Sequence, residues 1–456
     1  MGISSLGVGS SILTQDVLDQ LRAADEAKFV APVESRISDE NAKSTAFEQV
    51  DALMENAYES LKSLTEYGVF EARTTSVDDE DLVSVSASEN SDIQDFTLEI
   101  SKLATKEIEQ SGSFTSRTDN ISTGSGSMEL KVGDETYTID YEADTTLEGL
   151  KELIEKEAGE SVGATIVQVG DGDFRLLFSA ENTGTNQDIS ITDNGTTLNT
   201  ALTSGMTNVQ TAVDAEFKFN GLDITRSTNT IDDLLDGVSI TLKDVGTTDV
   251  SVKQDRDHIA ERITNFVDKY NSAMYQLNED TKSSENADER GVFSSDSTIK
   301  NMKSTLQNIL FTVGGDGGRL QEFGIEIDDD GRLELDSTVL NEQLDKNPEN
   351  VHSYFIGGTF TKEDGSTVEL EGAFTELEDS FARYSKGSAI LDKYNESIET
   401  RLDSLNEQKE SAVERLNSSY AIMQKRFAAY DSIISRYNTA SNMFTQMIDA
   451  EIAANN

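Results

Sequence analysis

The residue types that most often do chemistry in proteins form few clusters in this sequence. Asp328, Asp329 and Asp330, followed by Gly331, invite comparison with a calcium-binding loop. When Gly331 takes the sixth position of such a loop, the twelfth falls on Ser337, where a bidentate Glu is required. The flanking residues also alternate as in β-strands, whereas a loop of this kind joins two helices. We therefore expect a hairpin turn here and no calcium site.

The other candidate sites are weaker. The glycine-rich stretch 314–318 could wrap a phosphate, but no Gly-Lys-Ser/Thr follows it and Asp316 would repel the phosphate, so we expect a flexible connection. His258 and His352 each lack a second His at ligand spacing and are expected to be partly exposed structural residues. The absence of cysteine excludes thiolate metal sites and cysteine nucleophiles. Acidic pairs are too frequent to mark catalytic carboxylates. We predict a protein that is not an enzyme and needs no cofactor.

The overall charge argues against several classes of partner. The 456 residues include 86 acidic and 37 basic side chains, a formal net charge of −49 at pH 7. Such a charge disfavours binding to nucleic acid or to an anionic membrane, and it keeps copies of the chain apart until a specific contact forms. No apolar run approaches the roughly 18 residues that span a bilayer. The first ten residues lack the basic start and long apolar core of a secretory signal peptide.

The longest regular pattern lies at the C-terminal end, between about Ile390 and Ala454. Large apolar residues recur there at alternating steps of three and four, which places them in one narrow stripe along a helix. Ser441 fills the one polar position of this register. The stripe, which we call the seam, contains Met423, Phe427, Tyr430, Ile434, Tyr437, Phe444 and Ile448. A long helix with so narrow a stripe needs partners, from its own chain or from other copies.

The N-terminal region predicts two further helices. Thr14 can cap the first, with Asp16 in its first turn. Pro32 marks a bend, and the second helix ends near Gly68. Because both ends of the chain have the same helical pattern, we expect them to lie together as a stem.

Between about residues 69 and 252 the apolar period changes to two, which is typical of strands. Hairpins are predicted across Gly133-Asp134, across 170–173, across Asn220-Gly221 and between Leu242 and Val250. One short helix is expected around Leu147 to Ile154. The turn-dense residues 189–208 are expected to separate two β domains.

These patterns predict an α+β multidomain fold, in which N- and C-terminal helices form a coiled-coil stem and a helical bundle that enclose inserted β-rich domains. The division that we infer has residues 1–40 and 415–456 in a terminal coiled-coil leg domain, 41–70 and 256–414 in a helical bundle domain, 71–118 and 208–255 in a β-rich domain, and 119–207 in an inserted β-rich head domain.

Several stretches resemble one known family. Residues 1–11 (MGISSLGVGSS) are similar to the opening of the flagellar filament cap proteins, also called flagellar hook-associated protein 2. Residues 323–336 (FGIEIDDDGRLELD) and 427–434 (FAAYDSII) resemble that family's C-terminal region and terminal helix. Residues 146–184 resemble the small β-α-β-β module shared by flagellar hook-associated proteins and flagellins. The matches follow the family order along nearly the whole chain.

The resemblance implies a function that composition does not show. Members of this family leave the cell unfolded through the flagellar type III export channel and act outside the cell, at the distal tip of the filament. They assemble there as a ring of four to six copies and help newly exported flagellin fold and insert. The implied partners are sister copies, flagellin, a flagellar export chaperone and other hook-associated proteins.

In the family the paired terminal helices form legs that reach into the filament end. Transferred to this sequence, this places twelve residues on leg surfaces that contact flagellin or sister copies: Ile3, Leu6, Leu13, Val17, Leu21, Met423, Phe427, Tyr430, Ile434, Tyr437, Phe444 and Ile448.

Two other functions stay open at this stage. A protein of the hook–filament junction would share the module and the helical ends, and only its location at the filament base would distinguish it. A surface adhesin would use the β domains to bind host glycans, although the chain has no Trp and few aromatic residues in that region. The sequence gives neither the number of copies in a ring nor the flagellin surfaces that are contacted.

Overall fold

The computed structural model describes residues 14–66, 68–385 and 387–454 and contains both helices and sheets. The chain falls into two compact units, one formed by Met1–Glu66 and Ala260–Asn456 and the other by Tyr67–Ile259. A β-rich segment is thus inserted between helical parts from the two ends of the chain. This arrangement confirms the predicted fold class.

Both N-terminal helices begin as the sequence predicts. α1 (Gln15–Phe29) starts at Thr14, whose hydroxyl accepts a hydrogen bond from the Val17 N–H at 3.4 Å. α2 (Ala31–Thr65) carries Pro32 in its first turn, where the missing N–H of proline has no helical partner to lose. The break between α1 and α2 confirms the predicted bend.

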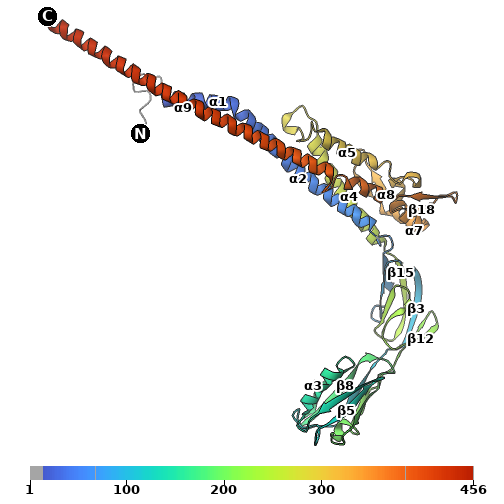
Figure 1. Cartoon of the computed structure of the whole chain (residues 1–456). Coiled ribbons are helices and arrows are strands. Elements are labelled where there is room, and N and C mark those ends of the chain that lie inside the picture. Colours follow the sequence, from blue (N-terminus) through green and yellow to red (C-terminus); the bar gives the residue numbers. More distant parts are fainter. Residues whose placement is uncertain (1–13, 67, 386, 455–456) are drawn as a thin grey trace. The chain divides into compact units, whose positions relative to one another are not determined.

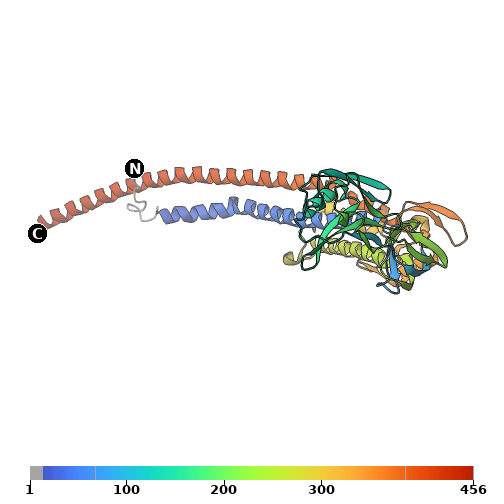
Figure 2. The same cartoon turned by 90° about the horizontal axis from the view of Figure 1, so that it is seen from below.

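The C-terminal pattern forms a single helix, α9 (Ala389–Ala454), of 66 residues. Figures 1 and 2 show α9 lying beside α1 and α2 and continuing beyond the start of α1. Leu18 and Val30 of the N-terminal helices pack in one cluster with Ala412, Leu416 and Tyr420 of α9. The prediction that the two helical ends lie together is confirmed for the described residues.

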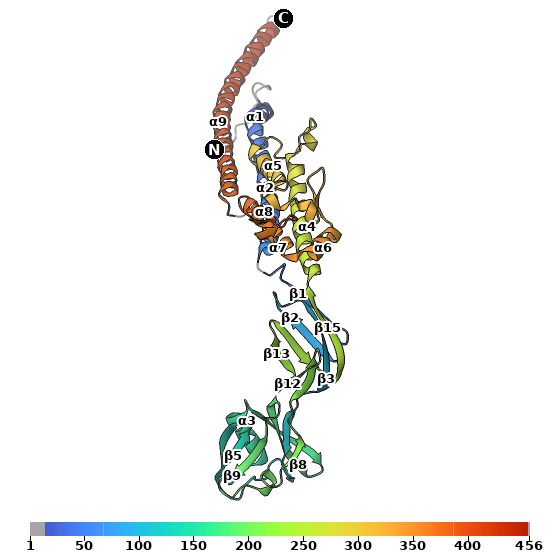
Figure 3. The same ribbon diagram turned by 90° about the vertical axis from the view of Figure 1, so that its right-hand side faces the viewer.

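The remainder of the first unit is a helical body with two small hairpins, whose helices gather beside α2 (Figure 3). Its elements are α4 (Arg256–Thr281), α5 (Ser297–Ile309), β16 (Ile325–Ile327), β17 (Leu333–Leu335), α6 (Ser337–Lys346), α7 (Pro348–Phe355), β18 (Gly358–Thr361), β19 (Thr367–Leu370) and α8 (Ala373–Ala382). Phe266 and Tyr270 of α4 pack against Phe381 of α8 in its core, where all three rings are buried.

The acidic turn at 328–331 is a hairpin turn, as predicted. Ile327 pairs with Leu333 across it, and the Asp328 carboxylate accepts hydrogen bonds from the N–H groups of Asp330 and Arg332 at 2.9 and 2.8 Å. The side chain that suggested a calcium ligand therefore holds the turn together.

The glycine-rich stretch 314–318 corrects another expectation. It forms a short 3₁₀ turn (Gly315–Gly317) packed against α7, so the predicted flexible connection is wrong. A Cβ atom at Gly314 would lie 2.5 Å from the Tyr354 ring. The glycines allow the backbone to approach that ring closely.

The first and last strands of the second unit belong to a pair of sheets that enclose one buried cluster. The five-stranded sheet has the order β1-β15-β3-β11-β12 and the three-stranded sheet the order β13-β14-β2. Their strands are β1 (Arg73–Val77), β2 (Val83–Ala87), β3 (Gln94–Lys102), β11 (Ala215–Phe219), β12 (Leu222–Arg226), β13 (Thr230–Leu235), β14 (Val238–Leu242) and β15 (Gly246–Gln254).

A separate buried cluster lies between the other two sheets of this unit and α3 (Leu147–Ala158), the predicted short helix. These sheets have the orders β10-β4-β8-β7 and β6-β5-β9. Their strands are β4 (Lys106–Gln110), β5 (Gly126–Val132), β6 (Glu135–Tyr141), β7 (Val162–Gly170), β8 (Asp173–Thr183), β9 (Ile189–Asp193) and β10 (Thr207–Gln210).

Three of the four predicted hairpins in this unit are confirmed: β5–β6, β7–β8 and β11–β12. The fourth is wrong, because β14 pairs with β2 and β13 while β15 pairs with β1 and β3. The chain crosses from one sheet to the other between Leu242 and Gly246. Within 189–208, expected as a separator, β9 pairs with β5 and so belongs to a sheet.

Candidate assembly surface

α9 has two parts that differ in their surroundings. Residues 389–419 pack against the N-terminal helices, and we call them, together with α1 and α2, the stem. Residues 420–454 are called the tail; its first two turns, through Phe427, still pack against α1, and the apolar face is exposed beyond them. Ile398 in the stem is fully buried, whereas Tyr437 and Phe444 in the tail are 74% and 67% exposed.

Polar contacts fix the stem in an antiparallel register. The Arg401 Nε atom lies 2.5 Å from a carboxylate oxygen of Glu40, and Arg22 donates to the Asn417 side chain at 2.6 Å. Further along α9, Gln424 donates to Gln15 at 3.4 Å. Residue numbers thus rise on α9 as they fall on the N-terminal helices.

Glu40 is the buried charge of this stem, with 6% of the residue exposed. Burial alone would raise the pKa of its carboxyl. Hydrogen bonds and charge interactions with Lys43 and Arg401 outweigh burial, so its pKa lies below the ordinary value. The carboxylate is therefore charged and paired at neutral pH.

The predicted contact residues fall into three groups. Met423 and Phe427 are half-buried against the cluster formed with α1, and Ile434 is also half-buried. Tyr430, Tyr437, Phe444 and Ile448 on α9 are exposed, as are Val17 and Leu21 on α1. Ile3, Leu6 and Leu13 lie outside the described residues. Met423 and Phe427 thus pack within the chain, whereas the side chains of the second group form an exposed apolar surface.

The structure adds a second apolar stripe that sequence analysis missed. Ile422, Ile433, Met443 and Met447 are all about half exposed or more. With about 100° of rotation per residue, Ile433 and Met447 lie roughly a quarter turn from the seam, and Ile422 and Met443 lie about a third of a turn from it. The seven-residue spacing from Ile433 through Ala440 to Met447 was the available signal, but these positions fall outside the seam register. The apolar face of the tail is therefore wider than a single seam.

The tail also differs from the rest of the chain in charge. Its three basic residues, Lys425, Arg426 and Arg436, balance its three acidic residues, so its net charge is zero in a chain of −49. The side of the tail opposite the seam carries Ala, Ser, Thr and Gln together with two of the basic residues, Lys425 and Arg436. Few charges would need to be desolvated if other molecules surrounded this helix.

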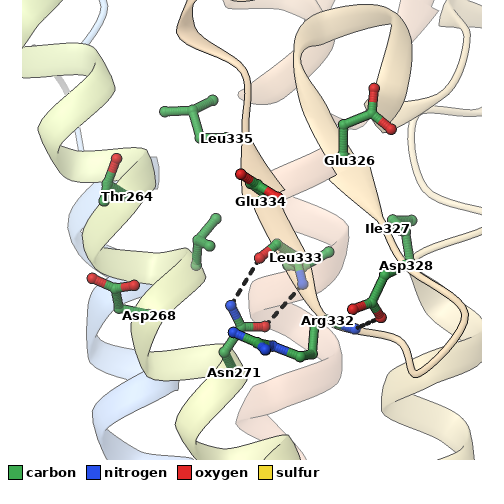
Figure 4. A pocket seen from close by; sticks show the side chains of 11 residues that line it. Thr264, Asp268, Asn271, Glu326, Ile327, Asp328, Arg332, Leu333, Glu334 and Leu335 are labelled. Carbon is green, nitrogen blue, oxygen red and sulfur yellow. Dashed lines mark hydrogen bonds between the residues drawn. The ribbon is translucent and has the colours of Figure 1, made fainter.

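The helical body also contains a cavity of about 660 Å³ between α4 and the β16–β17 hairpin (Figure 4). Asn271 and Arg332 line it, together with the carboxylates of Asp268, Asp328 and Glu334. Asn271 donates to the Leu333 carbonyl and accepts from the Leu333 N–H, both at 2.8 Å. The Asn271 side chain thus occupies the backbone hydrogen-bonding groups of Leu333 at the edge of the hairpin. Among the described residues no group of three or more His, Cys, Asp or Glu side chains is arranged to hold a metal ion.

Two family models match long segments of the chain. The model of the flagellar hook-associated protein 2 N-terminus matches residues 10–107, and that of its C-terminus matches residues 212–439. The chain belongs to the flagellar hook-associated protein 2 family. The resemblance read from the sequence is thereby confirmed.

Relatives in this family are similar along different shares of the chain. A flagellar hook-associated protein 2 of Helicobacter pylori is 31% identical over 257 residues, which cover 55% of this chain and 38% of that protein. One from Salmonella typhimurium is 27% identical over 478 residues and 98% of each chain. This chain thus spans well under half of the Helicobacter relative that it matches.

A solved structure agrees in fold. The D1-D2-D3 domains of the flagellar cap protein FliD from Escherichia coli align with 78% of this chain and 99% of that one, with a TM-score of 0.62 and 22% identity. The match of the hook-associated protein 2 family model ends at residue 439. Phe444 and Ile448 therefore lie beyond the matched segment. No described helix has both the length and the hydropathy needed to cross a membrane.

Proposed function

We propose that this chain is a flagellar filament cap protein that acts at the distal tip of the filament, outside the cell. Four to six copies form a small ring there and promote the folding and insertion of exported flagellin, which filament elongation requires. Family membership supports this function. The observation that carries it is the tail, a helix whose apolar face is exposed while its net charge is zero.

In this proposal residues 1–40 and 415–456 form the legs of the cap. Gln15 lies beside Gln424 in an antiparallel register. Leu18 and Val30 pack in one cluster with Leu416 and Tyr420, which supports a paired leg, and Ile3, Leu6 and Leu13 are proposed as further leg contacts.

The second stripe then faces another molecule. A helix with two apolar stripes about a quarter turn apart needs a neighbour on each. The exposed seam and the second stripe, which includes Ile433, Met443 and Met447, both contact flagellin or a sister copy. Methionine suits such a contact because its flexible thioether adapts to surfaces of different shape.

The remaining parts of the proposal follow the family. Residues 41–70 and 256–414 form the helical bundle. The insertion comprises a β-rich domain (71–118 and 208–255) and a head domain (119–207). Its two separate buried clusters support a division into two domains, although Phe114 and β4 pack with the head. The chain is not an enzyme, leaves the cell through the flagellar type III export channel, and meets an export chaperone and other hook-associated proteins on the way.

The function is tested by charging the seam. In cells that lack their own copy, a chain with Tyr437→Asp and Phe444→Asp should fail to label filament tips and should leave filaments short or absent, because buried carboxylates oppose docking. Ser432→Asp with Thr439→Asp adds the same charge at exposed positions on the side of the helix opposite the seam and should retain more activity. Normal filaments with the seam variant would refute the proposal. Labelling of the filament base by the unaltered chain would instead support a junction protein.

A further inference from the structure

The stem carries an acidic stripe on the outer side of α9. Seven carboxylates follow one another at steps of three or four residues: Asp392, Glu396, Glu399, Asp403, Glu407, Glu410 and Glu414. All seven residues are exposed. With about 100° per residue, this stripe lies on the side of α9 opposite the seam. It stops at Glu414, and the same line along the tail contains Ala421, Lys425, Ala428, Ser432 and Thr439.

Three cations of the stem are paired with carboxylates outside the stripe. Arg401 pairs with Glu40, Lys409 with Glu34, and Arg22 with Glu26. Among the described residues these ion pairs leave the seven carboxylates of the stripe without a cationic partner within 4 Å. Across the whole chain 86 acidic residues face 37 basic ones, so mobile counterions must balance the excess.

We propose that the acidic stripe is an electrostatic spacer, which opposes the side-by-side packing of stems from different copies and makes self-association through the tail depend on ionic strength. This inference rests on the proposed function, since it takes the tail as the contact surface. The partner to which it refers is a second copy of this chain. When stems lie parallel, each stripe comes near the carboxylates of its neighbour, while the neutral tails do not repel one another.

Salt controls this repulsion through the screening length. Exposed charges interact over about 8 Å at 0.15 M salt and only about 3 Å at 1 M. Copies with parallel stems are therefore repelled at low ionic strength and released from repulsion at high ionic strength. In this proposal low ionic strength keeps the single chain soluble, whereas higher ionic strength permits assembly. The acidic stripe is responsible for this difference.

The test measures self-association of the full-length chain by sedimentation velocity between 0.05 and 1 M NaCl. The unaltered chain should show an apparent Kd that falls by at least about tenfold over this range. Salt also strengthens apolar contacts, so the deciding comparison uses a stem variant, Glu407→Gln, Glu410→Gln and Glu414→Gln. Gln keeps the helix propensity of Glu. This variant should reach half-association at a NaCl concentration at least about twofold lower, because the repelling charges are removed.

A control variant changes the net charge equally in the other unit. Glu129→Gln, Glu142→Gln and Glu152→Gln alter exposed residues of the β-rich insertion and should leave the NaCl midpoint unchanged. Association that is independent of salt, or a stem variant that behaves like this control, would overturn the spacer. The seam variant Tyr437→Asp with Phe444→Asp should not associate at any salt concentration. If it does, the tail is not the contact surface and the proposed mode of assembly fails instead.

Discussion

Asn271 illustrates a device that recurs in this molecule at the scale of single residues. Its side-chain amide accepts from the N–H and donates to the C=O of one residue, Leu333. Asn350 does the same with Thr361, and Asn229 with Ala104. Each amide thereby satisfies both backbone groups of a residue at or near a strand end, which would otherwise need another strand or water.

The first prediction concerns this amide. Asn271→Ala removes both hydrogen bonds and leaves the Leu333 backbone groups half-buried, which should cost about 1–3 kcal/mol. Hydrogen exchange of the amides of β16 and β17 should accelerate accordingly. Asn278→Ala, on the same helix, is the control because Asn278 makes no side-chain hydrogen bond to another described residue. Equal exchange in the two variants would show that the amide does not stabilise the hairpin.

The second prediction concerns the glycine-rich turn. Gly314 has a φ of +83°, and a Cβ atom there would lie 2.5 Å from the Tyr354 ring, which is buried and stacked on Phe323 at 3.6 Å. Gly315 also has a positive φ, +48°, but a Cβ there would meet no atom within 4 Å. Gly314→Ala should therefore destabilise the helical body by about 1–3 kcal/mol more than Gly315→Ala.

Thermal unfolding of the two variants, measured in parallel, decides the matter. Both carry the cost of an alanine at positive φ, so their difference isolates the contact with Tyr354. If both variants unfold at the same temperature, the ring moves aside and the close approach carries no constraint.

These two sites mark the limit of sequence analysis at the residue scale. The turn chemistry of Asp328 and the helix cap at Thr14 were predictable because each acts on neighbours a few residues away. Asn271 acts on Leu333, 62 residues later, and Gly314 faces Tyr354, 40 residues later. No local pattern reveals such partners, so the glycine-rich stretch was misread as flexible.

At the scale of elements, periodicity predicted where each helix or strand lies in the sequence better than it predicted which other elements it packs against. The alternating steps of three and four residues placed α9 almost to its ends, since a helical pattern without Pro or Gly has few alternatives. Alternation also located β14 and β15 but not their pairing, because it reports which side chains face a core and not which strand lies alongside. The second stripe on the tail was not predicted, because its residues fall outside the register of the seam.

The third prediction concerns the pairing of α2 with α9. Since the folded-state pKa of the Glu40 carboxyl is below its ordinary value, its contribution to stability is present at neutral pH and is lost as the pH falls through the folded-state pKa. Glu40→Gln should weaken the stem at pH 7 by roughly 1 kcal/mol or less, because Arg401 is partly exposed and the pair is screened.

The measurement is hydrogen exchange of the α2 amides near Glu40 at pH 7 and below pH 4, corrected for the intrinsic effect of pH. The difference between the unaltered chain and Glu40→Gln should shrink as the pH falls, because an increasing fraction of the carboxyl is protonated. Glu48→Gln, on the exposed side of α2, should show little difference at either pH. A difference that grows on acidification would contradict the assignment of Glu40 as a charged, paired residue.

At the scale of the whole molecule, the β-rich insertion begins and ends at adjacent strands. β1 pairs with β15, with Arg73 opposite Gln254, and the pairing continues to the Asp255 N–H, which donates to Ala72 at 2.9 Å. The two ends of the insertion are thus held next to each other by its own hydrogen bonds. Because its two ends are adjacent, the β-rich segment can be inserted between residues 66 and 260 without separating the helical parts on either side of the insertion.

The fourth prediction follows from this closure. A fragment of residues 67–259 should fold alone, since both of its buried clusters lie within it. The remaining chain, with residue 66 joined to residue 260 by a short Gly/Ser linker, should keep the stem, the body and the tail. Circular dichroism and hydrogen exchange of each part should match the same residues of the full-length chain. The shortened chain should also retain salt-dependent association, because the stripe and the tail lie outside the insertion. If the fragment lacks a cooperative unfolding transition, or the shortened chain loses the stem, the two units stabilise each other and are not independent folding units.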